Sequence, residues 1–209
     1  MPFDKMNDSI AITLKRFKLL KSSEGLANLA NPYNEPYLVS LAVDAKGSAA
    51  PGIEFSAMPF PKVRRGQTVN FVGDGHLLYG PKNPGTFVAC SVLFMESDSD
   101  VRNLGEVIER LVKNKATDLG MKVIMAAHPG AAGTLAILKE LTQFVAGELK
   151  NNKDDELMRT EGTFLRDHPA PYHVNRQYTI QNDYVETDWQ VIPLPQANGQ
   201  GLAPRCITL

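Results

Sequence analysis

The sequence contains little cysteine and no excess of charge of either sign. Its 209 residues include two cysteines, which are too few for a disulfide scaffold or a four-cysteine zinc site. Lysine and arginine together number 22, and aspartate and glutamate number 23. The resulting net charge of −1 argues against a dedicated nucleic-acid-binding protein, which normally carries a basic excess.

Long apolar runs are also missing. No segment approaches the ~20 consecutive apolar residues that a membrane-spanning helix needs, and residues 1–20 lack the apolar core of a signal peptide. We therefore expect no transmembrane segment and a cytoplasmic location, with export by a non-classical route as the alternative. At 43% hydrophobic and 22% charged residues, the composition is that of an ordinary globular domain.

Motifs with a strong catalytic signature are absent from the sequence. The chain contains no GxSxG nucleophile motif, no HExxH metal-binding pair, no GxxxxGK[ST] phosphate loop and no GxGxxG dinucleotide motif. Residues 130–133 (GAAG) precede a predicted helix and could present backbone amides to an anion, although two glycines also simply permit a tight turn into the helix. The sequence therefore predicts no specific catalytic residue.

The first half of the chain has the hydrophobic pattern of β-strands. Alternating or continuous apolar residues predict five strands, and the last, TFVACSVLFM, is apolar on both faces and belongs in the centre of a sheet. The first strand shows a phase slip near Phe17 and Leu19, which a β-bulge would restore. Glycine, asparagine and proline predict loops over 22–36 and 73–85. The predicted strands are residues 9–20, 37–44, 53–58, 67–72 and 86–95.

The period then changes to that of helices. Apolar residues at spacings of three and four predict helices over 101–114 and 133–150, with Asp100 as the N-cap of the first. A short apolar piece, 121–127, fits either a helix or an extended segment and ends at His-Pro-Gly. These segments together predict a helical block between two sets of strands.

Strand patterns resume after the helical block and complete a β-sandwich. We predict strands over 157–166, 174–181 and 184–192, the last two joined as a hairpin through Asn182 and Asp183. Strands that outnumber helices and do not alternate with them are typical of a mainly β fold. The predicted fold is an eight-stranded antiparallel β-sandwich with an inserted α-helical pair.

Residues 1–194 then form a single domain, and residues 195–209 form an extended or mobile tail.

The helical insertion, 97–156, leaves and re-enters the same end of the sandwich, and acidic residues, including Glu156, flank it on both sides. Converging carboxylates suit calcium, which takes six to eight oxygen ligands. The alternative is that they are solvated and cap the neighbouring helices. The predicted metal site consists of Glu96, Asp98, Asp100, Asp154 and Asp155.

Residues 92–100, VLFMESDSD, place an acidic x-D-x-D loop directly after a central apolar strand. With the eight strands, this loop resembles the calcium- and phospholipid-binding β-sandwiches known as C-two domains. The resemblance implies calcium at this loop and peripheral contact with a membrane, for which Arg64 and Arg65 are the candidate binding residues. The chain departs from that family in its helical insertion and in its second acidic loop, where Asp44 stands alone.

Two histidines flank a proline-rich bend. His168 and His173 enclose Pro-Ala-Pro-Tyr, a rigid segment that would hold both imidazoles near one point. With Cys206 or a carboxylate they would form a transition-metal site, whereas exposed histidines in a turn are the ordinary alternative.

These patterns favour a noncatalytic protein-interaction or assembly module with a projecting helical pair. We expect a protein partner or a homo-oligomer, no nucleic acid, and calcium as the one candidate cofactor. Two alternatives remain. One is a hydrolase that uses Asp154 or Asp155 with His128, and the other is a structural subunit of a secretion or phage-like assembly with the tail from Pro195 as an arm.

Overall fold

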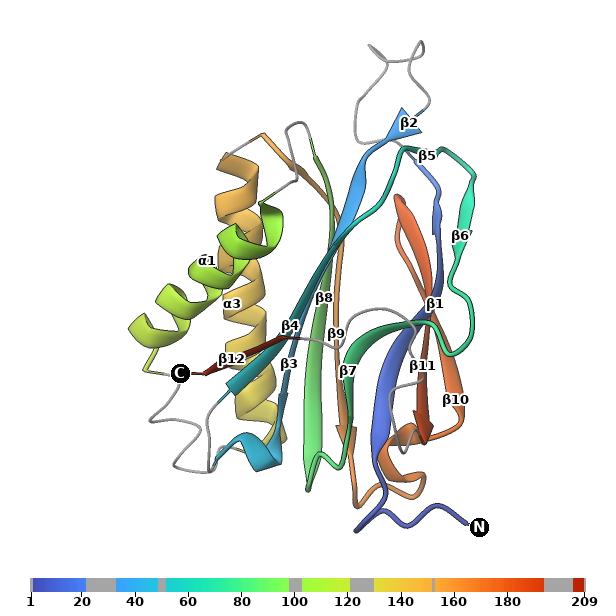
Figure 1. Cartoon of the computed structure of the whole chain (residues 1–209), viewed down its shortest axis with the longest axis vertical. Helices are drawn as coiled ribbons and strands as arrows, with labels where there is room; N and C mark the ends of the chain where they lie inside the picture. Colours follow the sequence, from blue (N-terminus) through green and yellow to red (C-terminus); the bar gives the residue numbers. More distant parts are fainter. Residues whose placement is uncertain are drawn as a thin grey trace.

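Two antiparallel sheets of five strands pack together, and two helices are inserted between strands of the second sheet (Figure 1). We describe this fold from a computed structural model of the chain. The mainly β, sandwich-like architecture that the sequence predicts is therefore confirmed. In the part of the chain that the structure describes, no helix is long and apolar enough to cross a membrane. The structure describes residues 2–21, 33–48, 52–97, 103–120, 130–151, 153–193 and 205–208.

The first sheet has the strand nearest the N-terminus at its centre. β1 pairs with β11 on one side and with both β6 and β7 on the other. β10 continues the sheet beyond β11 and forms the predicted hairpin with it. A β-bulge lies between Leu14 and Arg16 and restores the inward phase that the sequence loses near Phe17. The strands of this sheet are β1 (Ile10–Leu19), β6 (Thr68–Asn70), β7 (His76–Lys82), β10 (Arg176–Gln181) and β11 (Val185–Pro193).

The second sheet has the order β12-β4-β3-β8-β9 and is buried on both faces in its central strands. In β8, Val92 and Phe94 face the first sheet, whereas Ala89 and Leu93 face the helices. This two-sided burial explains why the sequence of β8 is apolar without alternation. The strands of this sheet are β3 (Pro36–Asp44), β4 (Gly52–Pro59), β8 (Phe87–Glu96), β9 (Asp155–Leu165) and β12 (Arg205–Thr208).

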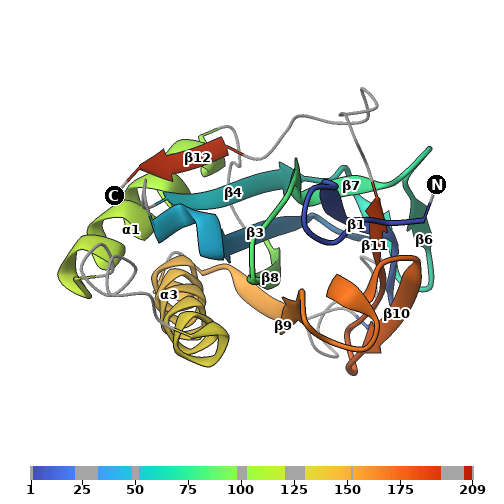
Figure 2. The same cartoon turned by 90° about the horizontal axis from the view of Figure 1, so that it is seen from below.

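Two helices cover the outer face of the second sheet. α1 (Leu104–Asp118) and α3 (Ala131–Asn151) each bury an apolar stripe against that face, on the side away from the first sheet (Figure 2). The predicted inserted pair is present, but it lies on the sheet and does not project from it, because its apolar stripes form a second core with the strands. α1 begins after Asn103 in the N-cap position, so the prediction of Asp100 as the cap is wrong.

The described residues form twelve strands, so the predicted number of eight is wrong, and several strands differ from the sequence prediction. Residues 73–85 contain β7, since its glycine and proline are tolerated in a strand at a sheet edge. The predicted tail contains β12, which forms by pairing with a strand far away in the sequence. The predicted strand at 67–72 shortens to β6. Residues 121–127 lie outside the described ranges. The remaining short elements are β2 (Tyr33–Asn34), β5 (Val63–Arg64) and two 3-10 helices, Ala45–Ser48 and Pro171–His173.

Candidate functional site

The predicted calcium site lies where the helical insertion leaves and rejoins the second sheet. Glu96 at the end of β8 and Asp155 at the start of β9 are direct partners in the pairing of these strands. Glu96 before the insertion and Asp155 after it, one residue from each acidic group, therefore lie side by side. Asp98 and Asp100 lie outside the described residues.

Uncharged donors hold two buried carboxylates at this place. The side-chain amide of Asn34 donates a hydrogen bond to Glu96, and the hydroxyl of Tyr37 donates one to Asp154 over 2.5 Å. Burial, together with the bond to Asp154, raises the pKa of Tyr37 well above its ordinary value, so the phenol stays protonated and remains a donor. An amide and a phenol thus each donate a hydrogen bond that stabilises the charge on a buried carboxylate.

The structure does not assemble a metal site from the residues it describes. Among them, no three histidine, cysteine, aspartate or glutamate side chains come together in an arrangement that would hold a metal ion. Calcium binding by the full predicted set stays a prediction, because two of its members fall outside these residues. The hydrolase alternative also stays a prediction, because its His128 lies outside the described residues as well.

The two histidines of the proline-rich bend do lie close together. The ring centroids of His168 and His173 are 4.4 Å apart, and the Nδ1 atom of His173 is hydrogen-bonded to the hydroxyl of Tyr178. Cys206, the proposed third ligand, is on β12 in the other sheet. The bend therefore brings the imidazoles together as predicted, but the described residues supply no third ligand from that list.

The two arginines proposed for membrane contact lie beside the small β2–β5 pair. Arg64 is exposed in β5, and Arg65 donates a hydrogen bond from Nε to the backbone oxygen of Leu20 over 3.3 Å. Both side chains remain accessible to solvent. Membrane contact through them stays a prediction.

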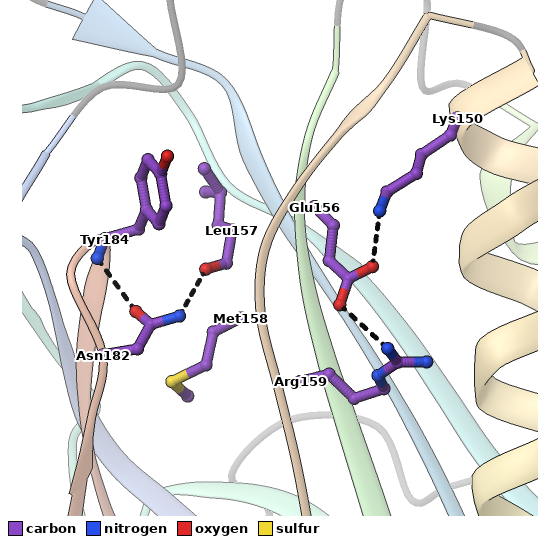
Figure 3. A pocket seen from close by; sticks show the side chains of 7 residues that line it. All are labelled: Lys150, Glu156, Leu157, Met158, Arg159, Asn182 and Tyr184. Carbon is purple, nitrogen blue, oxygen red and sulfur yellow. Dashed lines mark hydrogen bonds and ion pairs between the residues drawn. The ribbon is translucent and has the colours of Figure 1, made fainter.

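An open cleft of about 460 Å³ lies between α3, β9 and the β10–β11 turn (Figure 3). Its charged wall has Glu156 between two cations, with Lys150 Nζ at 2.9 Å and an Arg159 nitrogen at 3.5 Å. Lys21 adds a further positive charge, 5.4 Å from the ring centroid of Tyr184. These groups can take part in polar contacts, but Glu156 already neutralises part of the positive charge. The lining residues are Lys150, Glu156, Leu157, Met158, Arg159, Asn182 and Tyr184.

Asn182 lines this cleft, and its side chain connects the two sheets by hydrogen bonds. Its amide nitrogen donates a hydrogen bond to the carbonyl oxygen of Leu157 over 2.8 Å, and its Oδ1 accepts one from the backbone N–H of Tyr184 over 2.9 Å (Figure 3). Leu157 is the extra residue where the β8–β9 pairing shifts register, so its carbonyl is displaced from the regular ladder. The hairpin turn predicted at Asn182 therefore also has a structural role between the sheets.

The edge of β4 opposite β3 pairs with the strand β12. The two strands pair in antiparallel register, with Cys206 opposite Glu54 and Ile207 opposite Ile53. Ile207 is 3% exposed and belongs to the core between the second sheet and the helices, whereas its neighbours in β12 are exposed. β4 therefore holds a four-residue extended segment through backbone pairing and one apolar anchor.

Arg205 places the start of β12 against a strand and a helix. Its guanidinium lies 6.0 Å from the ring centroid of Phe55, and its Nη1 atom is 3.6 Å from a carboxylate oxygen of Glu109 on α1. The sequence prediction missed this surface because four residues after a glycine- and proline-rich stretch show no measurable period. The one available signal is that Ile207 and Thr208 are β-branched, which favours a strand.

A comparison of the sequence with models of known protein families and with curated proteins finds no match.

Proposed function

We propose that this chain is a protein-interaction or assembly module, and that the edge of β4 is its docking element. The observation that supports the proposal is β12 itself, because an extended segment of the same chain already occupies this edge in antiparallel register. Addition of a strand to a sheet edge is a general mode of peptide recognition, in which backbone hydrogen bonds supply affinity and side-chain pockets supply specificity.

The side chains of β12 define the peptide that this edge would accept. The pocket takes one aliphatic side chain, as Ile207 does, and its complete burial contributes about 1.5–3 kcal/mol. A basic residue two positions before the anchor can contact Phe55 and Glu109, as Arg205 does. The residue between them faces solvent. A ligand of the pattern basic–any–aliphatic in extended form satisfies all three positions.

A peptide-binding experiment tests this function. The full chain carrying Ile207→Asp should release β12, because an unpaired carboxylate cannot enter the apolar pocket. A labelled peptide of residues 203–209 carrying Cys206→Ser should bind this variant about 10- to 100-fold more tightly than the same peptide that also carries Ile207→Asp. The unmodified chain is the matched control, and it should bind more weakly because its own strand competes. Equal affinity for the two peptides would contradict the proposal.

Calcium binding at the insertion base is a second proposal, supported by the pairing of Glu96 with Asp155 and by the resemblance of residues 92–100 to C-two domains. Calorimetry should show millimolar or tighter binding that is lost in the Asp98→Asn/Asp100→Asn double variant. Absence of a binding signal with the unaltered chain would end this proposal.

A further inference from the structure

We propose that β12 exchanges between two copies of this chain, so that the C-terminal strand of each copy pairs with β4 of the other. This inference rests on the proposed function and names its partner as a second copy. The strand that fits the β4 edge belongs to this same sequence, so every copy carries both the edge and its ligand.

Exchange of β12 preserves the contacts that hold it. The pairing with β4, the burial of Ile207 and the contact of Arg205 with Glu109 form equally well within one chain or between two. Exchange of an identical element is therefore a low-cost route to a symmetric dimer. Because each copy both gives and receives a strand, the two exchanges produce a closed dimer and not an open chain of copies.

The attachment of β12 to the rest of the molecule is compatible with release. β12 is four residues long, and Ile207 is its one buried side chain. Arg205 and its partner Glu109 have exposed side chains, at 63% and 43% of their full surface, so this ion pair restrains the strand weakly. Few interactions therefore need to break before β12 leaves its own edge.

The connection between β11 and β12 is long in sequence. Eleven residues, 194–204, join β11 to β12 in the sequence. A chain of this length spans up to roughly 36–40 Å when fully extended. The length of the connection is therefore compatible with exchange.

A disulfide between two chains tests the exchange. Thr208 lies opposite Gly52, and directly opposed residues in antiparallel strands are within the distance that a disulfide requires. One copy carries Gly52→Cys with Cys206→Ser, and a second, tagged copy carries Thr208→Cys with Cys206→Ser. The remaining cysteine, Cys90, is fully buried and does not react. After mixing and oxidation, we expect a covalent heterodimer on a non-reducing gel.

Two controls separate exchange from random collision. Replacing the first copy with an Asn70→Cys/Cys206→Ser variant, whose cysteine is exposed on β6 of the other sheet, should lower the heterodimer yield at least tenfold. Adding Ile207→Asp to the tagged copy should lower it by a similar factor. A heterodimer yield equal to that of the Asn70→Cys control would overturn the exchange.

A third variant distinguishes failure of this inference from failure of the proposed function. In one chain that carries Gly52→Cys, Thr208→Cys and Cys206→Ser, oxidation should form the disulfide within the chain at low protein concentration and between chains at high concentration. A disulfide that forms within the chain at every concentration would overturn exchange and leave β4 as a peptide-binding edge. Failure to form it at any concentration would contradict both proposals.

Discussion

His76 places a buried imidazole between the two sheets. It is 6% exposed, its Nε2 atom lies 3.3 Å from the hydroxyl of Ser56, and its ring centroid is 5.9 Å from that of Phe71. Among the described residues, none hydrogen-bonds its Nδ1 atom. Burial lowers the pKa of His76 to about 4, so the folded state favours the uncharged ring.

The lowered pKa predicts a loss of stability in mild acid. Because the unfolded chain binds a proton at His76 near pH 6.5 and the folded protein near pH 4, the free energy of unfolding should fall as the pH drops between these values, by about 2–3 kcal/mol. Urea unfolding from pH 7 to pH 4 measures this change. His76→Gln should remove most of it, whereas His173→Gln should remove less, because His173 is only partly buried. Identical pH profiles for the unaltered chain and His76→Gln would contradict the assignment.

The strands and helices divide into those that local sequence predicts and those that it does not. β8, α3 and the β10–β11 hairpin follow from periodicity and turn chemistry, because their own residues determine which face is buried. β7 and β12 depend on pairing with strands distant in sequence, so their local pattern resembles a loop. The hydrogen-bond donors to the acidic residues could not be predicted either, because they are also distant in sequence: Asn34 is 62 positions from Glu96. Carboxylates were visible in the sequence, but their uncharged donors were not.

The turn before β7 depends on a glycine. Gly75 has φ of +94°, and a Cβ at this position would lie 2.5 Å from the carbonyl oxygen of Leu14. Gly75→Ala should therefore lower the free energy of unfolding by about 2–4 kcal/mol, through both backbone strain and a clash with β1. Gly66→Ala is the matched control, because Gly66 has φ of +81° but no atom near the added methyl group, and it should cost about 1 kcal/mol. Chemical denaturation of both variants measures the difference, and equal losses would refute the clash.

The molecule as a whole is held together by polar contacts between its sheets as well as by its apolar core. Lys82 on β7 lies 2.6 Å from Asp44 on β3 and 2.6 Å from Glu54 on β4. Tyr79 donates a hydrogen bond from its hydroxyl to Asp44 over 2.7 Å. Burial opposes the charge on Lys82, but the two carboxylates outweigh it and raise the pKa of Lys82. The edge of the first sheet is therefore fixed to two strands of the second.

Removal of the shared cation should destabilise the molecule. Lys82→Met leaves Asp44 and Glu54 without their shared cation, and the free energy of unfolding should fall by about 1–3 kcal/mol at pH 7. Lys139→Met, which removes an exposed ion pair with Glu161 at 3.9 Å, should change stability by less than about 0.5 kcal/mol. Urea unfolding of both variants at pH 7 measures these changes, and equal losses of stability would contradict this account of the contact.

The central position of β1 has a consequence for synthesis of the protein. Ile10 pairs with Pro193, so nearly the whole described chain separates the two strands. On the ribosome, β1 leaves the exit tunnel long before its main partner, β11, has been translated. Until then its apolar face lacks most of the first sheet, whereas β3, β4 and β8 are translated early and pair with one another. The pairing of β3, β4 and β8 can therefore form during translation, whereas each sheet is completed only when its last strand, β11 or β12, has been made.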